Sequence, residues 1–322
     1  MNKESLNRRQ FLKTAGVAAL GAESTSLSLA VSPALAQGTR QRSVRIAHMT
    51  DFHAWPDENG YVQGEITRAL HHAQELEDPP AFMLQTGDAI AESLVLSKDL
   101  TEMQWQFFTS VLASEWHLPV HHAIGNHDVW AWGLKGHQLE RDPLYGKNMA
   151  VKWLGISNRY YSFDGFGWHF IVLDSTHLPN KASDYPYTGQ LDEEQFAWMV
   201  ADIEGTPSST PICIASHIPI LAGCEFFDGE NEASGNWVVP GAWMHIDARR
   251  FRQFFLQHPN VRVCLSGHTH QFEWENHLNV HYQTDGAICG AWWEGAYLDF
   301  PPAYVLVDLY DDGSIESQFV TY

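Results

Sequence analysis

Five short apolar runs, rich in Val, Ile, Leu and Phe, recur along the chain. Runs of this length and composition are typical of buried β-strands. In an open α/β fold, side chains that directly follow the carboxyl ends of strands converge on one crevice. Residues far apart in the sequence can therefore share a cavity. The five runs are residues 44–49, 81–85, 120–124, 211–215 and 261–265.

Helical and further extended segments fill most of the chain between and after these runs. The spacing of apolar residues predicts helices over 64–76, 100–113, 192–203 and 247–257, and a long loop with a short helix over 133–155. Further strands are predicted over 160–163, 168–173, 272–275, 280–283, 286–289, 303–309 and 314–319. This order predicts one α/β domain, residues 37–322, with two stacked sheets and helices outside them.

The first 36 residues differ from the rest. Residues 7–13 read Asn-Arg-Arg-Gln-Phe-Leu-Lys, a weakly apolar run follows, and Ala-Leu-Ala at 34–36 provides a small-residue cleavage site. The segment resembles a twin-arginine export signal, which implies the twin-arginine export machinery as a partner and a periplasmic or secreted protein. The alternative is a basic leader that stays attached. The run is too short and too polar for a stable membrane anchor.

The charge of the chain restricts its partners. It has 39 acidic and 19 basic side chains, a formal net charge of −20, and loss of residues 1–36 would make it slightly more negative. Such a surface repels polyanions, so a long nucleic acid or an anionic membrane is excluded as a partner. A small phosphate ester remains compatible, because bound metal ions would invert the charge locally.

Four cysteines are expected to be structural. Cys213 and Cys264 lie inside apolar runs and read as small buried hydrophobic residues. No Cys-x-x-Cys spacing indicates a metal or redox motif, whereas a disulfide between some pair of cysteines stays open for an exported chain.

Residue types that bind metal ions directly follow the five apolar runs. Two pairs, Asp51 with His53 and His268 with His270, have members two positions apart, so in extended backbone they point the same way. Asp88 follows a glycine and is placed to bridge two ions. A mixture of carboxylate, amide oxygen and imidazole suits Zn, Mn or Fe better than Ca or Cu(I). The predicted ligands are Asp51, His53, Asp88, Asn126, His217, His268 and His270.

A single His217 or Asn126, taken alone, would more often be a core, surface or turn residue. The ordered series Asp-x-His, Gly-Asp, Gly-Asn-His-Asp, His, Gly-His-x-His, however, resembles the calcineurin-like metallophosphoesterase superfamily from residue 51 to residue 270. Residues 173–175 and 189–191 are similar to its branch of cyclic-nucleotide and glycerophosphodiester phosphodiesterases. The resemblance implies a four-layer α/β/β/α sandwich. It also implies two ligand sets, Asp51, His53, Asp88 and His270 for one metal, and Asp88, Asn126, His217 and His268 for the other.

The resemblance further implies the chemistry. Two cations about 3.5–4 Å apart would clamp a phosphoryl group, and a bridging hydroxide would attack phosphorus. His127 is the expected proton donor to the leaving oxygen, with Asp128 orienting its imidazole. The predicted activity is hydrolysis of small phosphodiesters.

Substrate contacts are expected from three residues: Trp130, whose ring would cover the organic part, His245, and Arg159, which would position the phosphate. Trp243 and Trp292 belong to a wider group of loop tryptophans whose rings would either cover the leaving group or fasten long loops to the core. Two other functions stay open. One is hydrolysis of phosphomonoesters of nucleotides or sugars, and the other is non-catalytic binding of a metal or ligand.

Overall fold

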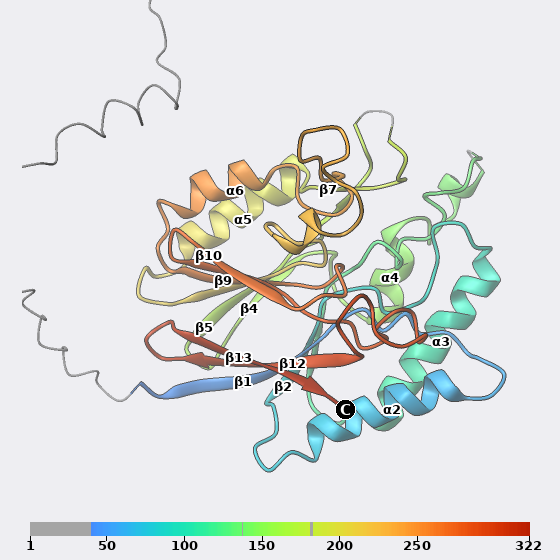
Figure 1. Cartoon of the computed structure of the whole chain (residues 1–322), viewed down its shortest axis with the longest axis horizontal. Helices are drawn as coiled ribbons and strands as arrows, with labels where there is room; N and C mark the ends of the chain where they lie inside the picture. Colours follow the sequence, from blue (N-terminus) through green and yellow to red (C-terminus); the bar gives the residue numbers. More distant parts are fainter. Residues whose placement is uncertain (1–39, 137, 181–182) are drawn as a thin grey trace, which may run out of the picture. The chain divides into compact units, whose positions relative to one another are not determined.

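Two mixed β-sheets stack face to face, and helices cover their outer sides, in the computed structural model of the chain (Figure 1). The structure describes residues 40–136, 138–180 and 183–322. The predicted export signal lies outside these ranges. The described residues from Arg40 onward form one compact unit. The four-layer α/β/β/α arrangement expected from the sequence is confirmed.

The first sheet has five strands in the order β13-β12-β1-β2-β3. Strands β1, β2 and β3 run parallel, and β12 and β13 add antiparallel partners at the other side of β1. The carboxyl ends of the three parallel strands therefore meet at one edge. The strands are β1 (Arg42–Met49), β2 (Phe82–Gln85), β3 (Val120–His122), β12 (Ala303–Tyr310) and β13 (Ile315–Thr321).

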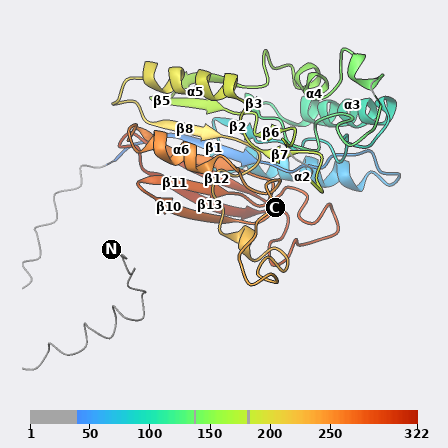
Figure 2. The same ribbon diagram turned by 90° about the horizontal axis from the view of Figure 1, so that it is seen from above.

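The second sheet has six strands in the order β10-β11-β9-β8-β5-β4, with β11, β9, β8 and β5 parallel. A small hairpin of β6 and β7 stands apart from it. The strands are β4 (Tyr161–Gly165), β5 (Trp168–Val172), β6 (Thr176–His177), β7 (Thr188–Gly189), β8 (Ile212–Ala215), β9 (Val261–Ser266), β10 (Glu273–His277) and β11 (Val280–Thr284). Seen from above, the strands of both sheets run in a similar direction, and many of the connecting loops gather at one end (Figure 2).

Three apolar cores hold the layers together. Ile46 and Val307 from the first sheet meet Phe170 and Val263 from the second in the central core. The outer cores lie between each sheet and its helices. The helices are α2 (Tyr61–Gln74), α3 (Lys98–Glu115) and α4 (Lys147–Leu154) on the first sheet, and α5 (Glu193–Gly205) and α6 (Ala248–Phe255) on the second. Two short 3-10 helices are η1 (Leu139–Arg141) and η2 (Cys224–Phe226).

Local sequence explains where the helices begin. Asp192 precedes α5, and its carboxylate accepts a hydrogen bond of 2.8 Å from the backbone N–H of Gln195. This contact satisfies one of the free N–H groups of the first turn. Glu193 and Glu194 then add negative charge where the helix dipole favours it. Ser97 caps α3 in the same way.

One predicted strand, 286–289, is wrong. Most of its backbone hydrogen bonds go to the loop that follows β1: Ile288 N–H donates to the Thr50 carbonyl, and Cys289 N–H donates to the Asp51 carbonyl. One bond, from Ala303 N–H at the start of β12 to the Ala287 carbonyl, reaches a strand but does not continue into a ladder. The apolar pattern of this segment therefore reflects burial beneath the loop that follows β1.

All four cysteines are buried and free. Within the described part of the chain, no helix has the length and apolar character needed to cross a membrane.

Candidate metal centre

The seven predicted ligands come together at the carboxyl ends of parallel strands from both sheets. Asp51 and His53 follow β1, Asp88 follows β2, and Asn126 follows β3. From the second sheet, His217 follows β8, and the loop after β9 supplies the remaining two histidines, His268 and His270. All except the half-buried His268 are buried. The structure therefore brings all five sequence blocks to one place.

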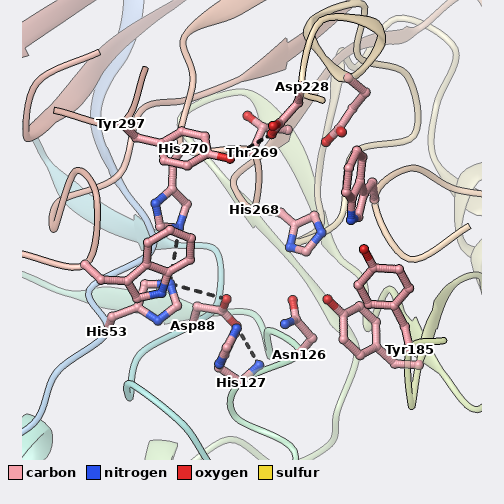
Figure 3. A pocket seen from close by; sticks show the side chains of 14 residues that line it. His53, Asp88, Asn126, His127, Tyr185, Asp228, His268, Thr269, His270 and Tyr297 are labelled. Atoms are coloured by element: carbon pink, nitrogen blue, oxygen red, sulfur yellow. Dashed lines mark hydrogen bonds and ion pairs between the residues drawn. The ribbon is translucent and has the colours of Figure 1, made fainter. Parts of the chain in front are cut away.

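The carboxylate of Asp88 lies at the middle of this group (Figure 3). Its Oδ2 atom lies 3.2 Å from His217 Nε2 and 3.6 Å from His53 Nε2. Its other oxygen, Oδ1, accepts a hydrogen bond of 2.8 Å from the backbone N–H of His127. Burial alone would raise the pKa of Asp88, but the neighbouring His217 and His127 hold it well below its ordinary value. The carboxylate is an anion that faces an imidazole on each side.

One set of polar atoms lies on the side of Asp88 that carries His53. His270 Nε2 lies 3.2 Å from His53 Nε2 and 3.4 Å from Asp51 Oδ1. This oxygen is buried and accepts no hydrogen bond from the described residues. Such a group of convergent acceptor atoms needs a positive ion or protons between them.

A second set of polar atoms lies on the other side of Asp88. His217 Nε2 lies 3.0 Å from the side-chain oxygen of Asn126 and 3.2 Å from His268 Nδ1. One possible ligand atom from each of Asp88, His217 and His268 lies within 4.8 Å of the other two. The same holds for a second group, formed by His53, Asp88 and His127. Asp88 thus belongs to both groups.

The outer nitrogens of three histidines fix the direction in which their lone pairs point. His217 Nδ1 donates to the Thr86 carbonyl at 2.8 Å, and His270 Nδ1 donates to the Gly290 carbonyl at 2.6 Å. His268 uses its Nε2 atom in the same way, toward the Ala242 carbonyl at 3.0 Å. A neutral imidazole that donates from one nitrogen presents a lone pair at the other. These contacts prepare the inward nitrogens to bind a cation, so the donor set fits a metal ion.

The backbone around the ligands is strained. Asp51, Asp88 and His268 have positive φ angles of 53°, 49° and 74°, and His53 and His270 share this conformation. Side-chain-bearing residues adopt it rarely, at a cost of the order of 1 kcal/mol or more each. Strain of this kind persists where the surrounding structure demands a particular side-chain direction, and here the direction is toward the ligand cluster.

The glycines of the sequence motifs allow the loops to approach one another closely. A Cβ atom at Gly125 would lie 2.1 Å from Asp88 Oδ1 and 2.2 Å from the Asp88 backbone nitrogen. A Cβ atom at Gly267 would lie 2.4 Å from Asp51 Oδ2. Distances this short exclude any side chain. These glycines are therefore required by the close approach of the ligand loops.

His127 lies beside the ligands, and its carboxylate neighbour differs from the one expected. Its Nδ1 atom lies 3.5 Å from Glu92 Oε2, and its ring packs edge-on against His53 at 4.9 Å. Asp128, the predicted orienting group, instead accepts backbone N–H bonds from Gly125 at 2.8 Å and Ile90 at 3.3 Å. Burial and the Asp88 charge raise the pKa of Asp128 to about 7. Asp128 thus shapes the ligand loop, and Glu92 faces the imidazole.

The three predicted substrate contacts have other roles. Trp130 is buried and donates its indole N–H to the Leu96 carbonyl at 3.1 Å. His245 is also buried, and its ring bonds to Asp247 at 2.8 Å. Arg159 forms ion pairs with the carboxylates of Asp174 and Asp192. None of the three is among the described residues that line the cavity over the ligands.

The cavity over the ligands has a volume of about 270 Å³. Two of the loop tryptophans, Trp243 and Trp292, line the cavity. This position agrees with the interpretation that their rings cover part of the substrate. Sequence reasoning missed the cavity's other aromatic and acidic lining residues, because they lie in loops without recognisable motifs. It also treated Cys289 as purely structural, although the thiol lies within 4.8 Å of both His53 and His270 ring nitrogens. The missed lining residues are Tyr185, Tyr187, Glu225, Asp228 and Tyr297.

This constellation is that of a metal-dependent hydrolase with buried carboxylate and imidazole ligands at the ends of parallel strands. The chain belongs to the calcineurin-like phosphoesterase family, whose model matches residues 44–272. The match extends from the first strand to just beyond the last ligand block. The chain is thus a metal-dependent phosphoesterase.

Individual proteins resemble the chain over most of its length. A 3′,5′-cyclic-nucleotide phosphodiesterase from Nostoc is 26% identical over 290 residues, which cover 84% of this chain and 90% of that protein. The 3′,5′-cyclic adenosine monophosphate phosphodiesterase CpdA of Escherichia coli is 24% identical over 71% of this chain and 70% of its own. A dimetal phosphatase from Danio rerio shares the fold, with a TM-score of 0.58 at 15% identity, over 88% of this chain and 100% of its own.

We expect Gly125→Ala to damage the centre, because the added methyl group would displace Asp88. The cost should be about 1–3 kcal/mol of unfolding free energy, typical of overpacking, with loss of most phosphoesterase activity. Chemical denaturation and a phosphoesterase assay of the metal-loaded protein measure both effects.

Gly64→Ala is the matched control, because a Cβ atom there meets nothing within 4 Å inside helix α2. It should raise stability by about 0.5–1 kcal/mol and leave activity unchanged. If Gly125→Ala and Gly64→Ala changed stability and activity equally, the requirement for a glycine at position 125 would be contradicted.

Proposed function

We propose that the protein hydrolyses small phosphodiesters with two divalent or trivalent transition-metal ions, Fe, Mn or Zn, bound on either side of Asp88. The position of Asp88 Oδ2, 3.2 Å from His217 and 3.6 Å from His53, is the observation that carries the proposal. One carboxylate oxygen between two imidazole groups suits a bridging ligand. Bound metal ions would supply charge that polarises the phosphoryl group and acidifies water.

The proposed ligand sets are those that the family resemblance implies. Asp51, His53, Asp88 and His270 would hold one ion. Asp88, Asn126, His217 and His268 would hold the other. Mixed oxygen and nitrogen donors of this kind suit Zn, Mn or Fe.

His127 is the proposed proton donor to the leaving oxygen. Its ring lines the cavity, and the Glu92 carboxylate 3.5 Å from Nδ1 favours a protonated imidazole. Glu92 is the positioning residue for His127 in this proposal, in the place first predicted for Asp128.

A diester substrate is favoured over a monoester by the cavity wall. Among the described residues that line the cavity, there is no lysine or arginine to meet the additional charge of a monoester. Five aromatic side chains line it, and these suit the second organic group of a diester. The names of the Nostoc and Escherichia coli relatives support a diester, and a cyclic nucleotide is one candidate within this class.

We also propose that residues 1–36 direct twin-arginine export and that the remaining chain works in the periplasm or outside the cell. The support is the Arg-Arg-x-Phe-Leu-Lys pattern at 8–13 and the small residues at 34 and 36. Twin-arginine export carries folded proteins, which suits an enzyme that acquires its metal ions in the cytoplasm.

The substrate class is tested with bis(p-nitrophenyl) phosphate and p-nitrophenyl phosphate on protein reconstituted with Mn²⁺ or Zn²⁺. We expect a higher kcat/KM for the diester. A clear preference for the monoester would favour the phosphomonoesterase alternative, and bound metal without turnover of either ester would favour a binding protein.

We expect His127→Ala to lower kcat on a diester with a poor leaving group by about 10²–10⁴-fold, because the leaving oxygen loses its proton donor. Metal content, measured by elemental analysis, should stay at the wild-type level. The control is His71→Ala, which removes an imidazole of α2 that pairs with Glu115 outside the cavity. Full activity of the His127 variant would refute the assignment.

A further inference from the structure

The wall of the cavity across from Asp88 is acidic. Glu225 and Asp228 line the same cavity as His53, Asp88 and His268. Both come from the irregular segment between β8 and α6. Figure 3 shows Asp228 across the cavity from Asp88 and His127. Carboxylates near a phosphoester site repel the phosphate, so their presence calls for a positive group on another part of the substrate.

Glu225 is buried without a sufficient partner. Its side chain is only 2% exposed, and its Oε2 atom has no hydrogen-bond partner among the described residues. Burial, together with the charges of Asp228 and Glu273, raises the pKa of Glu225 to about 8. The free cavity therefore disfavours the charged carboxylate. A cation bound beside Glu225 would supply the missing partner.

The two carboxylates are held in place by their surroundings. The side-chain N–H₂ of Asn231 donates to the backbone carbonyls of Glu225 at 2.6 Å and Asp228 at 2.9 Å. The Tyr297 hydroxyl donates to Asp228 Oδ2 at 2.8 Å. This network fixes the turn that carries both acidic side chains. The acidic wall is therefore organised before any substrate enters.

Two groups of aromatic rings line the same cavity as Glu225 and Asp228. Tyr185 lies 6.1 Å from Tyr187 and 6.4 Å from Trp243, measured between ring centroids. Trp292 lies 5.8 Å from Tyr297, and both rings also pack against His270. Aromatic faces attract cations, and cages of such rings recognise quaternary ammonium groups. Aromatic faces and carboxylates together favour a large, weakly hydrated organic cation over a neutral group.

We propose that the preferred substrates are phosphodiesters whose alcohol portion carries an ammonium group, bound by Glu225, Asp228 and the aromatic rings that line the cavity while the phosphate faces the metal ligands. This inference rests on the proposed function and specifies its substrate class. A neutral group at the same place would leave Glu225 Oε2 without a partner, and a second phosphate would be repelled by both acidic side chains. The cavity thus suits a zwitterionic substrate, whose phosphate would face the metal ligands and whose ammonium group would face Glu225 and Asp228.

The test compares two esters that differ only in charge. p-Nitrophenyl phosphocholine carries a quaternary ammonium, and p-nitrophenyl 3,3-dimethylbutyl phosphate replaces that nitrogen with a carbon of the same shape. On the full chain loaded with Mn²⁺, we expect kcat/KM to be at least about tenfold higher for the choline ester, within the range of one or two cation–π and charge contacts. Equal or faster hydrolysis of the neutral ester would overturn the inference and leave the proposed function intact.

Variants locate the preference within the cavity. Glu225→Gln should reduce the ratio of kcat/KM between the two esters to within about threefold of one. The matched control is Glu232→Gln, which removes an exposed carboxylate from the same segment outside the cavity. A ratio that survives in the Glu225 variant would contradict the assignment.

A binding measurement separates this inference from the proposed function. Trp243 and Trp292 line the cavity, so their fluorescence reports on an occupant. Choline should change the fluorescence at lower concentrations than its neutral isostere 3,3-dimethylbutanol, and Glu225→Gln should abolish the difference. If no ester were hydrolysed but this difference were seen, the proposed function would fall and the cation site would stand. No difference between the two alcohols would refute the cation site.

Discussion

The buried carboxylate of Asp88 is the point on which the site depends. It is an anion surrounded by imidazoles from both sheets, and burial of an unpaired charge would be prohibitive. Its position requires that the loops after β2, β3 and β8 approach within contact distance. Gly87 and Gly125 allow this approach, since a Cβ atom at either would overlap neighbouring atoms of the site. The stacked sheets supply the rigid support that holds these loops together.

The arrangement of the candidate ligands suits the phosphoesterase activity of the family. Acceptor atoms converge, the outward histidine nitrogens are fixed by backbone carbonyls, and several ligand residues hold strained backbone conformations. The converging acceptor atoms and the strained backbone each cost free energy, whereas the hydrogen bonds to backbone carbonyls stabilise the orientation of the rings. With metal ions bound, as we propose, the ligand side of the cavity would be positive, and the wall formed by Glu225 and Asp228 would carry the opposite charge. Substrate selection in our proposal arises from this separation of charge across a small volume.

Much of the architecture and the ligand set could be predicted from the sequence. Buried strands have a clear composition, and short-range motifs such as Gly-Asn-His-Asp place Asn126 and His127 directly after a strand. Residues 286–289 show the limit, because an apolar segment buried under a loop has the same composition as a strand. The orientation of Asp128 was also unpredictable. Its neighbour in sequence is His127, but backbone N–H groups of Gly125 and Ile90 bind its carboxylate.

Contacts between distant loops could not be predicted, because no periodicity links Glu225 or Tyr297 to the ligand blocks.

The most direct test of the central claim, a metal pair shared by Asp88, is anomalous X-ray diffraction from crystals grown with Mn²⁺ or Zn²⁺. The account predicts two anomalous peaks about 3.5–4 Å apart, one beside His53 and His270 and the other beside His217 and His268. A single peak, peaks elsewhere, or none at all in metal-saturated crystals would contradict it.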